Sequence, residues 1–222
     1  MDKLISLAHQ LASFVVGMEG NVSEKKDSFF LIKASGATLK NLCVDDLVAC
    51  ALSGEQINSC ENKKSSIDTS FHSLIFNKTG AKFIAHTHPV NTLKILSTPL
   101  IEEFANNRLF PDQVVFNGVA SLVVPYACPG LDLMHKIDKH LTLFQRKFNR
   151  DPKLILLKNH GIICIGETAE DCIITTEICE KSAEIFVGAK QLNDIDFLSE
   201  QDIVAIENDT NEIYRQSLIK LK

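Results

Sequence analysis

The sequence predicts an α/β protein: a single three-layer α/β/α domain, spanning residues 1–222, around a central mixed and partly antiparallel sheet. The length of 222 residues suits one α/β domain. Short apolar segments with β-branched residues alternate along the chain with segments whose apolar residues recur at helical spacing. Several predicted strand pairs are joined by links too short for a parallel crossover, which favours a partly antiparallel sheet.

Apolar spacing and chain-breaking residues indicate the elements of the first half. Leu4, Leu7 and Leu11 lie at helical spacing. Asp45 and Asp46 would occupy the first turn of a short helix, where acidic residues are favourable. The expected elements are a helix over 4–15, a strand over 28–33, a helix over 44–52, an exposed polar loop over 58–66, a helix over 68–79 and a strand over 82–88.

The second half continues the alternation. Met134, Ile137 and Leu141 lie on one apolar helical stripe. Capping boxes at Thr168-x-x-Asp171 and Ser199-x-x-Asp202 indicate two helix starts. The expected elements are strands over 114–116 and 121–124, a helix over 131–148, strands over 153–158 and 162–165, a helix over 168–189 and a final helix from residue 199.

Composition argues against several classes of protein. A net charge of -5, a pI near 5.8 and no dense Lys/Arg block argue against nucleic-acid binding. No apolar run approaches the ~18 to 20 residues of a membrane span, and the amino terminus has no signal-peptide pattern. Seven cysteines without a Cys-x-x-Cys pair indicate a reducing compartment. We therefore expect a soluble cytoplasmic protein with neither a nucleic-acid nor a membrane partner.

Two histidines at the end of a predicted strand form the first candidate site. Side chains at i and i+2 of a strand share a face, so the imidazoles of His86 and His88 point the same way. Together they can bind a divalent metal such as zinc, and His160, in a Gly-supported turn between two apolar strands, is the best third ligand. Taken alone, His-x-His is a weak signal, and His160 could instead be a turn residue bonded to a carbonyl. Three histidines with open positions are typical of catalytic zinc sites.

Four separated stretches extend this pattern. They are Gly20-Asn21-Val22-Ser23, Ala34-Ser35-Gly36, the run from Ser65 through His72 to His86-Thr87-His88-Pro89, and Lys158-Asn159-His160-Gly161 with its following helix. In their order and approximate spacing, from about residue 4 to residue 192, they resemble the class II aldolase/adducin family. That family includes fuculose- and rhamnulose-phosphate aldolases, ribulose-phosphate 4-epimerase and methylthioribulose-phosphate dehydratase.

The resemblance implies roles for the histidines and for one acid. It implies that His86, His88 and His160 bind Zn²⁺ and that Asp68, near the start of the middle helix, transfers a proton. The aldolases usually carry Glu at this position, and Asp is one methylene shorter. The alternative role for Asp68 is to close a Ser65-x-x-Asp68 capping box, and the two roles are compatible.

The resemblance also implies a phosphate pocket made of Gly20, Asn21, Ser35, Gly36 and Ser66. Small residues let backbone N–H groups approach an anion, and a helix amino terminus starting near Ser66 favours negative charge. The alternative is that Gly20-Asn21 and Ser35-Gly36 are ordinary turns. Ile67 replaces the second of two adjacent serines found in phosphate-utilising members, which leaves a smaller or unphosphorylated polyol open as the substrate.

These residues suit retro-aldol chemistry assisted by a metal ion. We expect a lyase, a zinc-dependent class II aldolase that cleaves a ketose 1-phosphate or a related sugar. A sugar-phosphate 4-epimerase or dehydratase on the same scaffold is the alternative among enzymes. A non-catalytic adducin-like binding module is the alternative outside them, and retention of all three histidines counts against it. The family's catalytic tyrosine has no counterpart here, so the general acid is unassigned. The resemblance alone implies a homotetramer.

Overall fold

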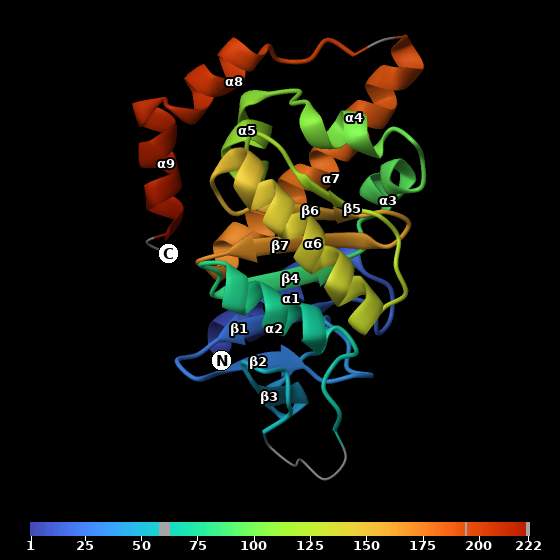
Figure 1. Ribbon diagram of the computed structural model, residues 1–222, viewed down its shortest axis with the longest axis vertical. Coiled ribbons are helices and arrows are strands. Elements are labelled where there is room, and N and C mark those ends of the chain that lie inside the picture. The colour runs from blue at the N-terminus through green and yellow to red at the C-terminus, as the bar shows by residue number, and fades with distance from the viewer. Residues whose placement is uncertain (58–62, 194, 221–222) are drawn as a thin grey trace.

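A seven-stranded mixed sheet forms the middle of the molecule (Figure 1). The computed structural model describes residues 1–57, 63–193 and 195–220. In their order across the sheet, the strands are β3 (Leu47–Ala51), β2 (Phe29–Lys33), β1 (Asn21–Lys25), β4 (Phe83–Thr87), β7 (Gly161–Gly166), β6 (Leu154–Leu157) and β5 (Leu122–Val124). Neighbours are antiparallel except for the parallel pair β5 and β6. The predicted fold class is confirmed.

Helices cover both faces of this sheet and produce the expected three layers. α1 (Asp2–Leu11), α3 (Val90–Leu96), α4 (Ile101–Asn106) and α7 (Ala169–Leu192) share a hydrophobic core with one face. α2 (Thr69–Lys78) and α6 (Leu131–Phe148) share a second core with the other face. α5 (Pro111–Asn117) packs against α7, and α8 (Glu200–Glu207) and α9 (Thr210–Lys220) follow at the carboxyl end. Within the described residues, no helix has the length and apolar character needed to cross a membrane.

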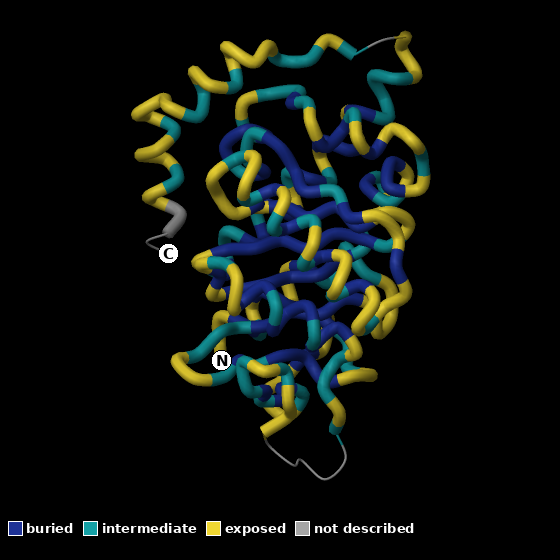
Figure 2. Tube along the Cα trace, in the orientation of Figure 1, coloured by how far each residue is buried: buried dark blue, intermediate teal, exposed yellow. Residues whose placement is uncertain are grey.

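The two cores follow from alternation along each strand. In β4, Phe83 and Ala85 contribute to the core beneath α1 and α7, whereas Ile84 contributes to the core beneath α2 and α6. Successive side chains of a strand point to opposite faces, so an uninterrupted apolar run buries both faces of the sheet. The strands accordingly form the buried middle of the trace in Figure 2. By the same parity, His86 faces the layer of α2 and α6, as Ile84 does.

The helix predicted over 44–52 is wrong. Val44–Asp46 forms a single 3-10 turn, and Leu47–Ala51 is the strand β3 at the edge of the sheet. The acidic pair belongs to that one turn, because the Asp46 carboxylate accepts the Cys43 backbone N–H at 3.2 Å. The acidic pair therefore marks a helical turn correctly, but tertiary pairing with β2 makes the residues after that turn a strand.

The strand predicted over 114–116 is also wrong, because Pro111–Asn117 forms α5. Pro111 occupies the first helical turn, where its missing N–H is not needed, and Asp112 adds favourable negative charge there. Gly118, with a φ of +80°, follows the last helical residue. A short apolar run cannot by itself distinguish a strand from a buried helical face, and here the flanking residues decide for the helix.

The sequence patterns do not predict β1, α3, α4 or α9. β1 is polar at Asn21, Ser23 and Glu24, yet it lies between β2 and β4 in the sheet. The remaining predicted elements agree with the structure to within a few residues, and the capping boxes at Thr168 and Ser199 are both present. Of the loop predicted over 58–66, residues 58–62 lie outside the described residues.

Candidate metal centre

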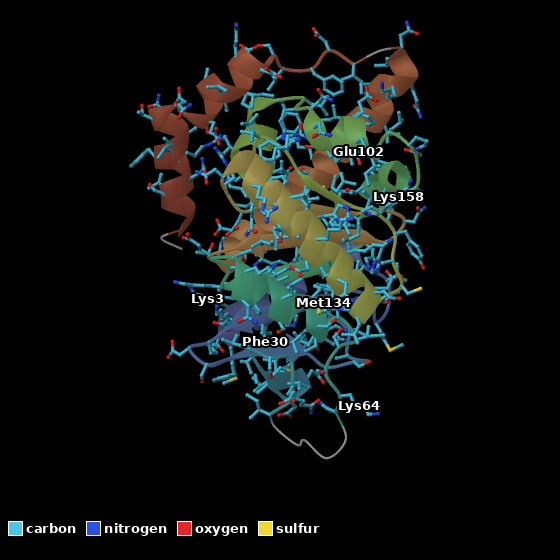
Figure 3. All side chains as sticks on the ribbon, viewed as in Figure 1. Lys3, Phe30, Lys64, Glu102, Met134 and Lys158 are labelled. Carbon is cyan, nitrogen blue, oxygen red and sulfur yellow. The ribbon has the colours of Figure 1, made fainter. Side chains whose placement is uncertain are left out.

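Three histidine rings meet where β4 ends and β7 begins. β4 runs antiparallel to β7 with His86 opposite Ile163, so the turn between β6 and β7 that carries His160 lies beside the end of β4. Figure 3 labels Lys158, which follows β6 and marks this edge of the sheet. The Nε2 atoms of His86 and His88 are 3.0 Å apart. One ring nitrogen from each of the three histidines lies within 4.8 Å of the others.

Hydrogen bonds and close contacts orient these rings. His86 Nδ1 lies 2.9 Å from the Ile162 carbonyl oxygen, so Nδ1 carries the proton and Nε2 keeps a free lone pair. His88 Nδ1 lies 3.4 Å from Glu19 Oε2. A carbonyl or carboxylate in this outer position is the usual partner of a metal-binding histidine. His160 Nδ1 is buried and has no hydrogen-bond partner among the described residues, which fits a nitrogen intended for a metal ion.

Burial keeps the rings of His86 and His160 in the neutral form that binds metal. Burial lowers the pKa of His86 well below 6.5, and the neighbouring His88 and His160 lower that pKa further. Burial, assisted by His88, lowers the pKa of His160 to about 4. Two nitrogens bound at about 2.0 to 2.1 Å to one tetrahedral ion are about 3.3 Å apart. The 3.0 Å between His86 and His88 is close to that spacing, so the donor set fits a divalent ion of the zinc type.

Two glycines allow this close packing. A Cβ on Gly161 would lie 2.4 Å from His88 Cδ2 and 2.6 Å from the Thr87 carbonyl oxygen. A Cβ on Gly20 would lie 2.7 Å from the His86 carbonyl oxygen, and the φ of +67° at Gly20 is one that glycine adopts most easily. The arrangement of the rings therefore depends on glycine at both positions.

Asp68 lies beside the histidines as a buried carboxylate. Its Oδ2 accepts a hydrogen bond from Asn21 Nδ2 at 2.8 Å and lies 3.9 Å from His86 Nε2. Its Oδ1 is buried and has no hydrogen-bond partner within the described part of the chain. Burial raises the pKa of Asp68, whereas the Asn21 hydrogen bond and the charges of His88 and Lys33 oppose that rise. A carboxyl group held in this way can exchange a proton with a molecule bound at the site.

The capping box predicted at Ser65-x-x-Asp68 is not formed. Asp68 is the N-cap residue of α2, but its side chain makes no capping hydrogen bond. Instead, Ser66 Oγ accepts the backbone N–H of Asp68 at 3.3 Å, and the Asp68 carboxylate bonds to Asn21 on β1. The interpretation of Asp68 as the residue that closes a capping box is therefore wrong, and its carboxylate lies in the histidine cluster.

Three of the five residues predicted to bind phosphate lie around Asp68. Asn21 is buried, and its Nδ2 also lies 3.3 Å from Ser66 Oγ. Gly20 directly precedes Asn21, which begins strand β1 rather than forming a turn. The other two, Ser35 and Gly36, are exposed on the turn after β2, where the Ser35 N–H donates to the Lys64 carbonyl oxygen at 2.8 Å.

Lys33 joins these two groups of residues, and the sequence patterns do not single it out. It lies on β2 with 3% of its surface exposed. Its Nζ donates to the carbonyl oxygens of Met18 at 3.1 Å and Ala37 at 2.7 Å. Burial lowers the pKa of Lys33, and nearby carboxylates oppose that shift. Because Met18 lies just before Gly20 and Ala37 just after Gly36, the ammonium group lies between the two predicted halves of the phosphate pocket.

Ile67 borders a different part of the surface. Its side chain is 66% exposed. It lines an open groove of about 720 Å³ together with Leu131 and with Met134, which Figure 3 labels on α6. The isoleucine leaves the contact between Asn21 and Ser66 in place. The polar cluster around Asp68 is therefore retained despite the lost serine.

Fold and site together define a class of protein: a mixed α/β sheet whose buried three-histidine group could bind a metal ion beside a carboxylate. The chain matches the model of the Class II Aldolase and Adducin N-terminal domain over residues 3–187. It therefore belongs to the class II aldolase/adducin family, as its motifs predict. Class II aldolases are metal-dependent, and the enzymes of this superfamily to which the chain is similar are lyases.

Proteins similar to this chain catalyse more than one reaction. The L-fuculose phosphate aldolase of Methanocaldococcus jannaschii is 29% identical over 191 residues, which cover 83% of this chain and 95% of that protein. The methylthioribulose-1-phosphate dehydratase of Bacillus subtilis is 27% identical over 157 residues, covering 68% of this chain and 73% of that protein. The crystal structure of YgbL from Escherichia coli matches with a TM-score of 0.79 and 21% identity over 92% of this chain and 96% of that chain, a likeness of fold.

Proposed function

We propose that the protein is a zinc-dependent class II aldolase that cleaves a carbon–carbon bond of a ketose 1-phosphate or a related sugar. One observation carries the proposal: Asp68, whose Oδ1 has no partner among the described residues, lies 3.9 Å from His86 in a cluster of three histidines. The similarity to an L-fuculose phosphate aldolase over most of both chains supports a sugar phosphate as the substrate.

The protein's own residues divide the work between holding a metal ion and moving a proton. His86, His88 and His160 hold Zn²⁺ through their ring nitrogens. When bound, zinc supplies a Lewis acid for negative charge on the oxygens of the substrate. Asp68 exchanges a proton with the substrate carbon that loses its bond to carbon, and its Oδ1 is the atom available for this exchange.

The remote end of the substrate is held by residues that do not react. Gly20, Asn21, Ser35, Gly36 and Ser66 bind the phosphate through backbone N–H groups and short polar side chains, with Ser35 contributing its hydroxyl because its N–H donates to the Lys64 carbonyl oxygen. Lys33 adds positive charge between the two parts of this pocket. Fixing the phosphate orients the reacting carbon toward Asp68 and removes much of the entropy barrier to reaction.

Two other functions use the same residues differently. A dehydratase or a sugar-phosphate 4-epimerase would need the same metal ligands and acid, and the similarity to a methylthioribulose-1-phosphate dehydratase favours the dehydratase of the two. An adducin-like binding module would not need ring nitrogens of three histidines within 4.8 Å of one another. Product analysis separates the enzymes: an aldolase releases an aldehyde, whereas a dehydratase removes water and leaves the carbon chain whole.

Metal content and aldehyde release test the proposal directly. We expect about one zinc per chain in the purified protein and aldehyde release from a ketose 1-phosphate. His88→Ala should lower zinc occupancy and activity together. Protein that neither contains nor binds a divalent metal, whatever metal is added, would exclude the enzyme and favour the binding module.

Replacement of the acid tests its role separately from the metal. Asp68→Asn is nearly isosteric, so we expect the fold and the zinc content to persist while turnover falls by roughly 10² to 10⁴. If turnover stays within a few fold of the wild type, Asp68 is not the proton-transfer group.

The proposed enzyme acts as a homotetramer in the cytoplasm, where its cysteines would stay reduced; the six that the structure describes are all free thiols. Light scattering of the zinc-loaded protein measures the oligomeric state, and a monomer at micromolar concentration would contradict the tetramer.

A further inference from the structure

A buried chain of hydrogen bonds runs from β1 through α2 to Asp68. Ser23 Oγ lies 2.6 Å from His72 Nδ1, and His72 Nε2 lies 2.5 Å from Asn21 Oδ1. Asn21 Nδ2 in turn donates to Asp68 Oδ2 at 2.8 Å. Ser23 and His72 have no exposed surface, and Asn21 has 3%. All four side chains are therefore fixed by one another rather than by solvent.

The donor and acceptor groups of these four side chains allow the hydrogen bonds between them to run in only one direction. An ionised Asp68 can only accept, so the amide of Asn21 must turn its Nδ2 toward Asp68 and its Oδ1 toward His72. Asn21 Oδ1 then requires a proton on His72 Nε2. Burial lowers the pKa of His72 to about 3, so the ring is neutral and has only that one proton. His72 Nδ1 must therefore accept from the Ser23 hydroxyl group.

If these hydrogen bonds ran in the opposite direction, Asp68 would lose its hydrogen-bond donor. With the proton on Nδ1, the His72 ring would offer a lone pair to Asn21, and the amide would turn over. Its Oδ1 would then face Asp68 Oδ2, so that two acceptors would meet inside a buried site, which is costly. The tautomer of His72 thus decides whether Asp68 is held or repelled.

We propose that His72 and Ser23 are positioning residues for Asp68. They fix the amide of Asn21 so that it holds Oδ2 and leaves Oδ1 as the one oxygen that exchanges a proton with the substrate. The inference rests on the proposed function only in giving that proton transfer to Asp68. It also makes Asn21 a residue that aligns the acid, in addition to its place in the phosphate pocket.

Nuclear magnetic resonance of protein labelled with ¹⁵N-histidine tests the direction of the chain without any substrate. We expect the His72 ring to have Nε2 protonated and Nδ1 bare, with no titration between pH 6 and 8. Ser23→Ala removes the hydroxyl donor to Nδ1 and should shift the ¹⁵N signal of that nitrogen, because its lone pair then has no hydrogen-bond partner, while Nε2 keeps its proton. A wild-type ring protonated at Nδ1 would overturn the proposal, as would a Ser23→Ala spectrum identical to that of the wild type.

A pair of amide substitutions tests the consequence for turnover, with L-fuculose 1-phosphate as the probe. His72→Gln can place an N–H near the position of Nε2 and should keep kcat within a few fold. His72→Asn carries the same group one methylene shorter and cannot reach Asn21, so kcat should fall by about 10- to 100-fold with zinc content unchanged. His135→Asn, on the exposed side of α6, is the matched control.

The NMR spectra and the kinetic measurements together distinguish a failure of this inference from a failure of the proposed function. Equal kcat in His72→Gln and His72→Asn, or a loss in both that follows a loss of zinc, would overturn the positioning role. If the probe is not cleaved at all, the aldolase assignment for that sugar fails, and the spectra alone decide the direction of the hydrogen-bond chain.

Discussion

Glu19 is the partly exposed carboxylate that faces the outer nitrogen of His88, at 3.4 Å. Partners of this kind fix the orientation of a metal-binding ring, and their loss typically weakens metal affinity by about 10- to 100-fold. We therefore expect Glu19→Ala to weaken zinc binding by about that factor, measured by competition with a coloured chelator. Glu102→Ala, on α4 (Figure 3), is the control. Equal affinities in the two variants would show that Glu19 does not orient His88.

The buried position of Lys33 leads to a separate prediction about substrate binding. Its buried ammonium group lies between the two parts of the proposed phosphate pocket, where it would act on a part of the substrate that does not react. A charged hydrogen bond contributes about 1.5 to 3 kcal/mol, so Lys33→Met should raise KM by roughly tenfold to a hundredfold with a smaller change in kcat. Inhibition by inorganic phosphate should weaken in parallel. Lys40→Met, at an exposed position further along the chain, should leave both quantities unchanged, and an unchanged KM in Lys33→Met would remove Lys33 from the pocket.

Some residues of the site can be predicted from local sequence patterns, whereas the contacts of others depend on the three-dimensional fold. The alternation of side chains along a strand is a local rule, so the i, i+2 spacing of His86 and His88 is enough to predict that they share a face. The contacts of Glu19, Lys33 and His72 depend instead on which strand lies next to which, and no local pattern encodes that. A buried lysine or histidine is recognisable only once its neighbours are known.

At the scale of elements, the turn between β6 and β7 carries the tightest packing of the site. A side chain on Gly161 would meet His88 Cδ2 at 2.4 Å and the Thr87 backbone at 2.6 Å. We expect Gly161→Ala to displace the His88 ring and to lower zinc occupancy, because the backbone on one side cannot yield. Elemental analysis and thermal unfolding measure the two effects. Gly188→Ala, with open space around its Cα in α7, should change neither. Full zinc occupancy in Gly161→Ala would mean that the turn can shift freely.

The errors in predicting elements have a common physical cause. Residues 44–52 and 114–116 are short, and their apolar content suits either a strand or a buried helical face. Pairing with β2 makes the first a strand, and Pro111 with Gly118 makes the second part of a helix. Of the long elements, α6 is predictable because its apolar stripe continues over several turns, and α7 because a capping box marks its start. β1 is missed because Asn21, Ser23 and Glu24 interrupt the apolar pattern expected of a buried strand.

For the whole molecule, buried neutral histidines make stability depend on pH. The pKa of His72 is about 3 in the folded protein against 6.5 in the unfolded chain, so the unfolded state binds the extra proton between these values. Stability is therefore unaffected by His72 above about pH 6.5 and falls as pH decreases below it, by about 1.4 kcal/mol per pH unit. The raised pKa of Asp68 acts in the opposite sense at lower pH.

Urea unfolding of the metal-free protein between pH 7 and 5 measures this dependence. The unfolding free energy of the wild type should fall as the pH is lowered, and His72→Gln should show a shallower slope by about one proton, or about 1.4 kcal/mol per pH unit. Parallel slopes for the two proteins would mean that His72 is not held neutral in the folded state.

The order of strands across the sheet divides the chain at the site. β3, β2, β1 and β4 come from the first half, and β7, β6 and β5 come from the second, so β4 and β7 form a seam where the halves meet. His86 and His88 lie on one side of that seam and His160 on the other. An ion bound by all three rings would therefore link the two halves of the sheet. Zinc would then slow amide hydrogen exchange along β4 and β7 far more than in β3 or β5, so the ion would hold the architecture together as well as take part in its chemistry.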